Sequence, residues 1–120
     1  MHDTLNPSPP NTAANALRAK FFRGLADPSR LAIMESLRNS SQTVGELVVH
    51  TGLSQPNTSN HLACLLECGL VQREQNGRYA VYGLADDKIT ALLALADDLV
   101  SDHHERLAAC VRYTGKEDRT

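Results

Sequence analysis

The stretch from Thr43 to Gly69 constrains the fold of this 120-residue chain more than any other. Thr43-Val44-Gly45-Glu46 has the spacing of a capping box, in which two side chains satisfy free backbone N–H groups at a helix start. A turn follows at His50-Thr51-Gly52-Leu53, and Ser54 is a favourable N-cap for a longer helix that ends at Gly69. A short helix, a Gly-containing turn and a second helix with a polar start predict a helix-turn-helix.

The residues after this motif have the pattern of a β-hairpin. Two strand-like runs, 70–75 and 78–84, flank Asn76-Gly77. Asn-Gly between such runs is the strongest short-range hairpin signal, because both residues accept positive φ. A hairpin directly after a helix-turn-helix is a wing. We therefore predict a mainly α fold with one small β-hairpin, a winged helix-turn-helix.

Apolar residues at helical spacing predict the other helices. A first helix covers 13–25, and a second runs over 28–38 after the N-cap Asp27, with Leu31, Ile33, Met34 and Leu37 turned inward. A last long helix begins near Asp86 or Asp87. Its apolar stripe consists of Ile89, Leu92, Leu93, Ala96, Leu99 and Val100. We expect one domain over 13–112 between a flexible tail, 1–12, and a polar tail, 113–120.

Composition limits the compartment and the kind of partner. No apolar run approaches the roughly 20 residues that span a bilayer, and the polar, Pro-rich residues 1–15 do not form a secretory signal. We therefore expect a cytoplasmic protein with no membrane partner. The net charge of −2 means that any contact with DNA comes from a local surface. Three cysteines in such a chain are available for metal binding or redox chemistry rather than for a disulfide framework.

The start of the longer predicted helix is rich in side chains that can hydrogen-bond to bases. Gln and Asn pair bidentately with adenine, and Ser and Thr bind phosphates or bases. Alone, such a run would be only a solvated polar face, but within a winged helix-turn-helix it predicts contact with double-stranded operator DNA. The candidate residues are Ser54, Gln55, Asn57, Thr58, Asn60 and His61, with Arg78 in the wing and Arg73 and Lys20 as further phosphate contacts.

Cys64 and Cys68 lie four residues apart on this helix, which places both thiols on one face, about 5–6 Å apart at Cβ. They could be small buried apolar groups. However, both lie more than about 100° from the centre of the stripe made by Leu62, Leu65 and Leu66, on the side of Asn57 and His61. With Cys110 they predict a three-thiol site, and His103, His104 and Glu105 are additional donors to consider. Thiolates select soft ions such as Cd, Pb, Hg, Zn, Cu(I) or As(III).

Over about residues 16–99 the chain resembles the ArsR/SmtB family of winged-helix metal-sensing repressors. The features that carry the resemblance are Leu25-Ala26-Asp27-Pro28-Ser29-Arg30, Glu46-Leu47, Leu53-Ser54-Gln55-Pro56-Asn57-Thr58-Ser59-Asn60-His61-Leu62 and Gly69-Leu70-Val71. The resemblance implies a homodimer joined by the first and last helices. It also implies that the metal-free protein represses an operator and that metal binding releases it.

The family places metal sites at several positions, and only one matches here. Val48 and Val49 occupy the place of the cysteines of one site. Asp86 matches a second site on the last helix, but Lys88 and Leu99 depart from it. Cys64, Cys68 and Cys110 match the CmtR-type cadmium/lead sensors, a resemblance that implies a tail cysteine donated by the partner protomer. We expect one Cd(II), Pb(II) or Hg(II) ion per protomer and no small organic substrate.

Other functions of the same thiols stay open at this point. A mercury- or arsenic-responsive member of the family would use the same three cysteines. A redox sensor would pair Cys64 or Cys68 with Cys110. A thiol enzyme using Cys64 and His61 lacks a Gly-rich oxyanion loop and an orienting acid, so we do not expect an enzyme.

Overall fold

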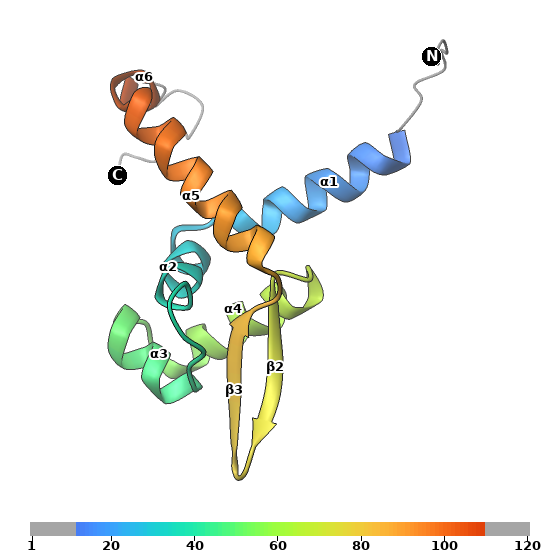
Figure 1. Cartoon of the computed structure of the whole chain (residues 1–120), viewed down its shortest axis with the longest axis vertical. Coiled ribbons are helices and arrows are strands. Elements are labelled where there is room, and N and C mark those ends of the chain that lie inside the picture. Colours follow the sequence, from blue (N-terminus) through green and yellow to red (C-terminus); the bar gives the residue numbers. More distant parts are fainter. Residues whose placement is uncertain (1–11, 110–120) are drawn as a thin grey trace. The chain divides into compact units, whose positions relative to one another are not determined.

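The computed structural model describes residues 12–109, which form two compact units (Figure 1). The first unit ends at Asp86 and the second begins at Asp87. The domain bounds of 13–112 stay a prediction. The predicted tails lie outside the described residues, except for Thr12, which begins the first helix. Within residues 12–109 no helix is long and apolar enough to cross a membrane.

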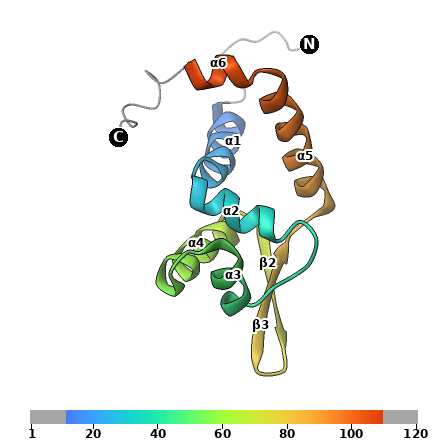
Figure 2. The ribbon, with the colours of Figure 1, turned by 90° about the vertical axis from the view of Figure 1, so that its left-hand side faces the viewer.

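From residue 12 to Asp86 the first unit contains four helices and a hairpin, as predicted. Helices α2, α3 and α4 pack on one another, and the hairpin extends away from them (Figures 1 and 2). The buried apolar residues of the first unit are Ile33, Met34, Leu37, Leu47, Leu62, Leu65, Leu70 and Val71. Leu31, which we predicted to face inward, is 37% exposed. The elements are α1 (Thr12–Leu25), α2 (Pro28–Ser36), α3 (Val44–Thr51), α4 (Gln55–Glu67), β2 (Val71–Asn76) and β3 (Tyr79–Leu84).

Local capping defines the helix-turn-helix. The Thr43 hydroxyl accepts from the Glu46 N–H at 3.2 Å, and the Glu46 carboxylate accepts from the Thr43 N–H at 2.9 Å, which completes the predicted capping box. Helix α3 is capped by Gly52, which has a left-handed φ of +78°. Residues with a side chain rarely adopt this conformation. Ser54 accepts from the Asn57 N–H and caps α4. Short-range contacts therefore define both ends of the turn.

A second set of caps joins α1 to α2. The Asp27 carboxylate accepts from the N–H groups of Ser29 and Arg30, at 2.8 and 3.1 Å, and so begins α2. The Arg30 side chain reaches back: Nε donates to Gly24 O at 2.7 Å and Nη2 donates to Arg23 O at 2.8 Å. These carbonyls belong to the last turn of α1, where helix carbonyls lack intrahelical partners, and Arg23 O also accepts from the Ala26 N–H at 3.2 Å. We call this arrangement the α1–α2 corner.

The corner predicts a pH-dependent contribution to stability. Burial raises the pKa of Asp27, but N–H donors from Arg30 and Ser29 and the charges of Arg30 and His61 outweigh burial and lower the pKa below 3.8. A carboxylate with a lowered pKa stabilises the fold above its unfolded-state pKa, and that contribution is lost as pH falls through the folded-state value.

We expect Asp27→Asn to reduce the free energy of unfolding by about 0.3–1 kcal/mol at neutral pH, because Asn keeps the cap but not the charge. Urea unfolding of both proteins should show this gap at pH 7 and its closure as pH falls below about 4. A gap that stays constant down to acid pH would contradict this role for the Asp27 charge.

The hairpin differs from its prediction by one residue at the turn. Strands β2 and β3 are antiparallel, with Val71 opposite Leu84 and Asn76 opposite Tyr79. The two-residue loop is therefore Gly77-Arg78, not Asn76-Gly77. Gly77 has φ +65°, so it still provides the left-handed residue that a tight hairpin requires.

The described part of the second unit, residues 87–109, contains α5 (Asp87–Asp102) and α6 (His104–Ala109). Within the predicted stripe, Ile89 and Leu93 are buried. Leu99 and Val100 are 55% and 50% exposed. The short helix α6 was not predicted, since only one long helix was expected in this region.

Candidate nucleic-acid interface and thiol site

Helix α4 separates the candidate DNA-binding residues onto two faces. Thr58, Leu62 and Leu65 lie on the inner face and are buried. The polar residues on the exposed surface of its first half are Gln55, Asn57, Ser59 and Asn60, beside the N-cap Ser54. No acidic residue occupies the first turn, so the partial positive charge of the helix start is not offset there. This surface can accept bases or phosphates.

Thr58 corrects one of our predictions. Its side chain is 0% exposed, and its hydroxyl donates to Ser54 O at 2.8 Å. Thr58 therefore packs in the core and presents nothing to DNA. Ser59, which the sequence analysis did not select, is exposed and lies four residues after Gln55, on the same side of the helix. This i, i+4 spacing from Gln55 would have identified Ser59 as a residue of the exposed face.

Two other candidates lie away from the exposed start of α4. His61 is half-buried, and its charge acts on Asp27 at the start of α2. Lys20 belongs to α1 and lines a hollow beside the cysteines.

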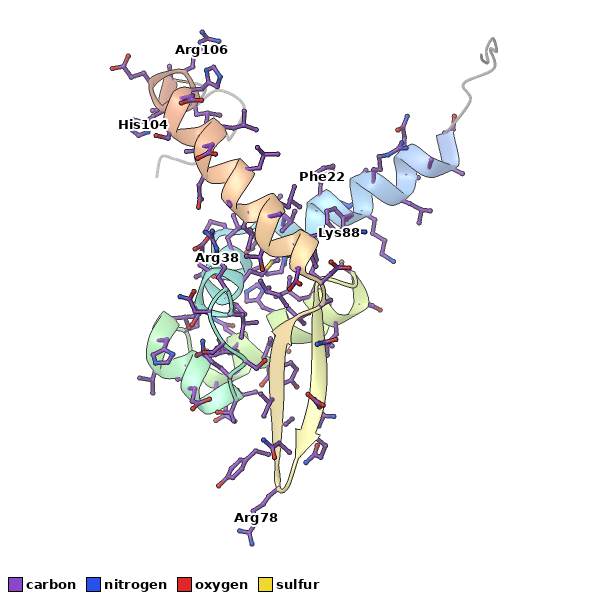
Figure 3. All side chains as sticks on the ribbon, viewed as in Figure 1. Phe22, Arg38, Arg78, Lys88, His104 and Arg106 are labelled. Carbon is purple, nitrogen blue, oxygen red and sulfur yellow. The ribbon has the colours of Figure 1, made fainter. Side chains whose placement is uncertain are left out.

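Arg78 and Arg73 lie on the wing. Arg78 is exposed at its tip and points away from the helices (Figure 3). Arg73 lies on β2 and donates to Gln75 Oε1 at 3.3 Å. The tip of the wing is therefore the better position for a separate phosphate contact.

Cys64 and Cys68 line a hollow of 260 Å³ between α4 and the end of α1. Both thiols are half-buried and in no disulfide within residues 12–109, so they are neither core residues nor fully solvated. A Cβ built on Gly24 would lie 3.1 Å from Cys68 Sγ and 2.9 Å from Leu70 Cδ1, so only glycine fits there without displacing a neighbour. The other side chains lining the hollow are Lys20, Arg23, Arg30 and Glu67.

The third predicted thiol, Cys110, lies outside the described residues. Within residues 12–109 no three His, Cys, Asp or Glu side chains lie close enough together to hold a metal ion. His103, His104 and Glu105 are exposed where α5 meets α6. The described part of the chain thus supplies two soft ligands at the hollow. The sequence analysis did not include Lys20, Arg23 and Arg30 in this site, because they are far from Cys64 and Cys68 in sequence.

Comparison with known proteins decides the family. The model of the bacterial regulatory protein, arsR family, matches residues 27–73, from the N-cap of α2 through the helix-turn-helix and into β2. A protein described as a probable mercury resistance operon repressor, from Streptomyces lividans, is 38% identical over 101 residues, which cover 84% of this chain and 81% of that relative. The chain belongs to the ArsR family.

Other ArsR-family relatives agree in sequence and in fold. The HTH-type transcriptional regulator CmtR of Mycobacterium tuberculosis is 43% identical over 75 residues, 62% of this chain and 64% of that relative. A solution structure from Mycobacterium bovis superposes with a TM-score of 0.72 at 27% identity, over 84% of this chain and 93% of that one. It is described as the homodimeric winged helix-turn-helix DNA-binding domain of a possible ArsR-family regulator. The relatives are DNA-binding transcription regulators, so this ArsR-family chain is a regulator and not an enzyme.

Proposed function

We propose that this ArsR-family regulator is a homodimeric, cytoplasmic repressor that binds operator DNA when metal-free and releases it on binding a soft metal ion. Cys64, Cys68 and Cys110 are the proposed ligands, with one Cd(II), Pb(II) or Hg(II) ion per protomer. The observation that carries the proposal is the position of two thiols in one hollow on the same helix that presents the candidate DNA-binding face. The names of relatives support a metal effector, since one is a mercury resistance repressor.

The proposed operator contact uses the exposed residues of α4 and the tip of the wing. Gln55, Asn57, Ser59 and Asn60 read bases or phosphates in the major groove, and Arg78 binds a phosphate beside it. Two α4 helices in a symmetric dimer would enter half-sites about 34–36 Å apart.

Exposed apolar residues support the dimer. Leu95 and Leu99 on α5 and Leu17 and Phe22 on α1 are each more than half exposed, so each of the two helices offers more than one large apolar side chain to a partner. The described fold is also similar to a homodimeric domain. We therefore assign dimerisation to the first and last long helices.

The hollow suits a thiolate-bound ion. Two thiolates and a third from Cys110 carry more negative charge than a divalent ion cancels, and Lys20, Arg23 and Arg30 line the same space. The thiols face the end of α1 rather than the exposed start of α4, so we propose that metal opposes DNA by changing how α1 and α4 pack. A coupling free energy of about 1–3 kcal/mol would be enough to switch occupancy.

Ultraviolet titration of the reduced protein with Cd(II), Pb(II), Hg(II) and Zn(II) tests the site. A thiolate-to-metal charge-transfer band that saturates at one ion per protomer, together with loss of fluorescence anisotropy of bound DNA, is the expected result. A protein without this band that releases DNA on peroxide treatment in metal-free buffer would instead be a redox sensor using the same thiols.

Two substitutions distinguish base contacts from phosphate contacts. We expect Asn60→Ala to weaken operator binding by about 1–3 kcal/mol and to affect random-sequence DNA much less. Arg78→Ala should weaken binding to both DNAs and reduce the slope of log affinity against log salt by about 1. Anisotropy at several salt concentrations measures both effects. If Asn60→Ala lowered the affinity for both DNAs equally, Asn60 would not be a base-reading residue.

A further inference from the structure

Gln42 is a buried polar residue that joins three elements. It lies between α2 and α3 and is 6% exposed. Its N–H donates to Tyr82 O at 2.9 Å, and its C=O accepts from the Tyr82 N–H at 2.7 Å, which forms a β-bridge to β3. Its side-chain Nε2 donates to Ser36 O at the end of α2, and Oε1 lies 2.6 Å from His50 Nδ1 on α3. We call these four residues the Gln42 cluster.

The hydrogen bonds fix the orientation of the amide and the tautomer of the histidine. The carbonyl of Ser36 can only accept, so the Gln42 amide nitrogen must face it. The amide oxygen then faces His50, and Nδ1 must carry the hydrogen that it donates. Each polar group of Gln42 therefore has a partner, and these hydrogen bonds offset the cost of removing the amide from water.

The base of the wing is held against the same segment by close packing. A Cβ on Gly83 would lie 2.6 Å from Ser41 Oγ, which shows how closely the segment before α3 approaches β3. On the other side, the Ala85 N–H donates to Leu70 O at 3.1 Å, where α4 leads into β2. Residues 72–79 of the wing are exposed, and its two strands pair with each other from Val71 and Leu84 to Asn76 and Tyr79.

We propose that Gln42 and His50 are positioning residues for DNA binding. They hold the base of the wing against the helix-turn-helix, so that Arg78 at the tip and the exposed start of α4 bind one DNA simultaneously. They do this without touching DNA themselves. The proposal rests on the proposed function, because it requires the wing to contact DNA.

The physical reason is preorganisation. A second contact on the same molecule adds to affinity only when the linking structure holds it at the correct distance and angle. A wing whose base is loose must be ordered at the moment of binding, and that cost offsets the phosphate contact. Loss of the His50 hydrogen bond should therefore reduce the effect of Arg78 rather than weaken all contacts equally.

A double-mutant cycle tests this, with anisotropy on a random-sequence duplex of about 30 base pairs at low salt. In the wild type, Arg78→Ala should weaken binding about three- to tenfold. In the His50→Ala background the same change should weaken binding less than about twofold. His50→Asn places an amide nitrogen where Nδ1 lies, so it should restore the full Arg78 effect. Val49→Ala, at an exposed neighbour on α3, is the matched control and should also retain it.

The outcomes separate the positioning role from the proposed function. An Arg78 effect of equal size in the wild-type and His50→Ala backgrounds overturns the positioning role and leaves the wing contact standing. Arg78→Ala that binds like the wild type overturns the wing contact and the positioning role with it. Hydrogen exchange at the Tyr82 amide gives a readout without DNA: it should quicken in His50→Ala and not in His50→Asn, and unchanged exchange contradicts the proposal.

Discussion

Cys64→Ser and Cys68→Ser are each expected to lower soft-metal affinity at least about a hundredfold and to abolish metal-driven release of DNA. Loss of an outer-shell partner of a metal ligand already costs about 10–100-fold, so loss of a thiolate ligand should cost more. A serine hydroxyl is a hard, weakly acidic donor that a soft ion does not prefer. Operator affinity without metal should stay near the wild-type value, because both side chains lie in the hollow beside α1.

The experiment measures the charge-transfer band and DNA anisotropy for each variant at fixed protein concentration. Cys110→Ser should behave like the other two, and metal-driven release that survives it would rule out the three-thiol site. Ser101→Ala, at an exposed residue of α5, is the control expected to keep the full response. Because thiols must lose protons to bind, affinity in the wild type should fall as pH decreases.

Leu65→Ala is expected to reduce the free energy of unfolding by about 2–5 kcal/mol. Leu65 is 0% exposed on the inner face of α4, so truncation leaves a cavity that its neighbours fill only in part. Whole domains are stable by only about 5–15 kcal/mol, so this single change removes a large fraction of the total. Urea unfolding followed by circular dichroism measures it, at one protein concentration since dimerisation adds to apparent stability.

Leu66→Ala is the matched control for this prediction. Leu66 is the next residue on the same helix but is only half-buried, so its loss should cost less than about 2 kcal/mol. Similar costs for the two variants would mean that an interface outside the described contacts covers Leu66. The remaining folded fraction of Leu65→Ala should still bind DNA, because the exposed side chains of α4 are unchanged.

Features that depend on neighbouring residues could be predicted from the sequence. The capping box at Thr43, the N-caps at Asp27 and Ser54 and the helix stop at Gly69 are confirmed, because each involves contacts within a few residues. The turn predicted from His50 begins two residues later, because α3 continues to Thr51. The order of helices and hairpin follows from these local features. The winged helix-turn-helix could therefore be predicted from the sequence.

One misprediction had a local signal that was not used: Thr58 was selected for its chemistry, although its position four residues before Leu62 places it on the buried face. The other features that were mispredicted or missed depend on pairing between separate segments. The turn shifted by one residue because the register of the hairpin is set by its pairing from Val71 to Leu84. The bridge from Gln42 to Tyr82 joins residues forty positions apart, and no local pattern announces it.

The thiol site was predicted only in part for the same reason. Spacing alone placed Cys64 and Cys68 on one face of a helix. That the end of α1 covers this face, with Gly24 against Cys68, requires the packing of two helices. The position of Cys110 lies outside the described residues, so its part in the site stays a prediction.

The α1–α2 corner also limits the angular freedom of α1. A helix of 14 residues is about 21 Å long, so a tilt of about 10° at its last turn would displace its first residues by about 4 Å. Arg30 binds two successive carbonyls of that turn with one planar guanidinium, a geometry that a lysine cannot reproduce. Arg30, which belongs to α2, thus determines the direction of α1 and with it the positions of the exposed Leu17 and Phe22.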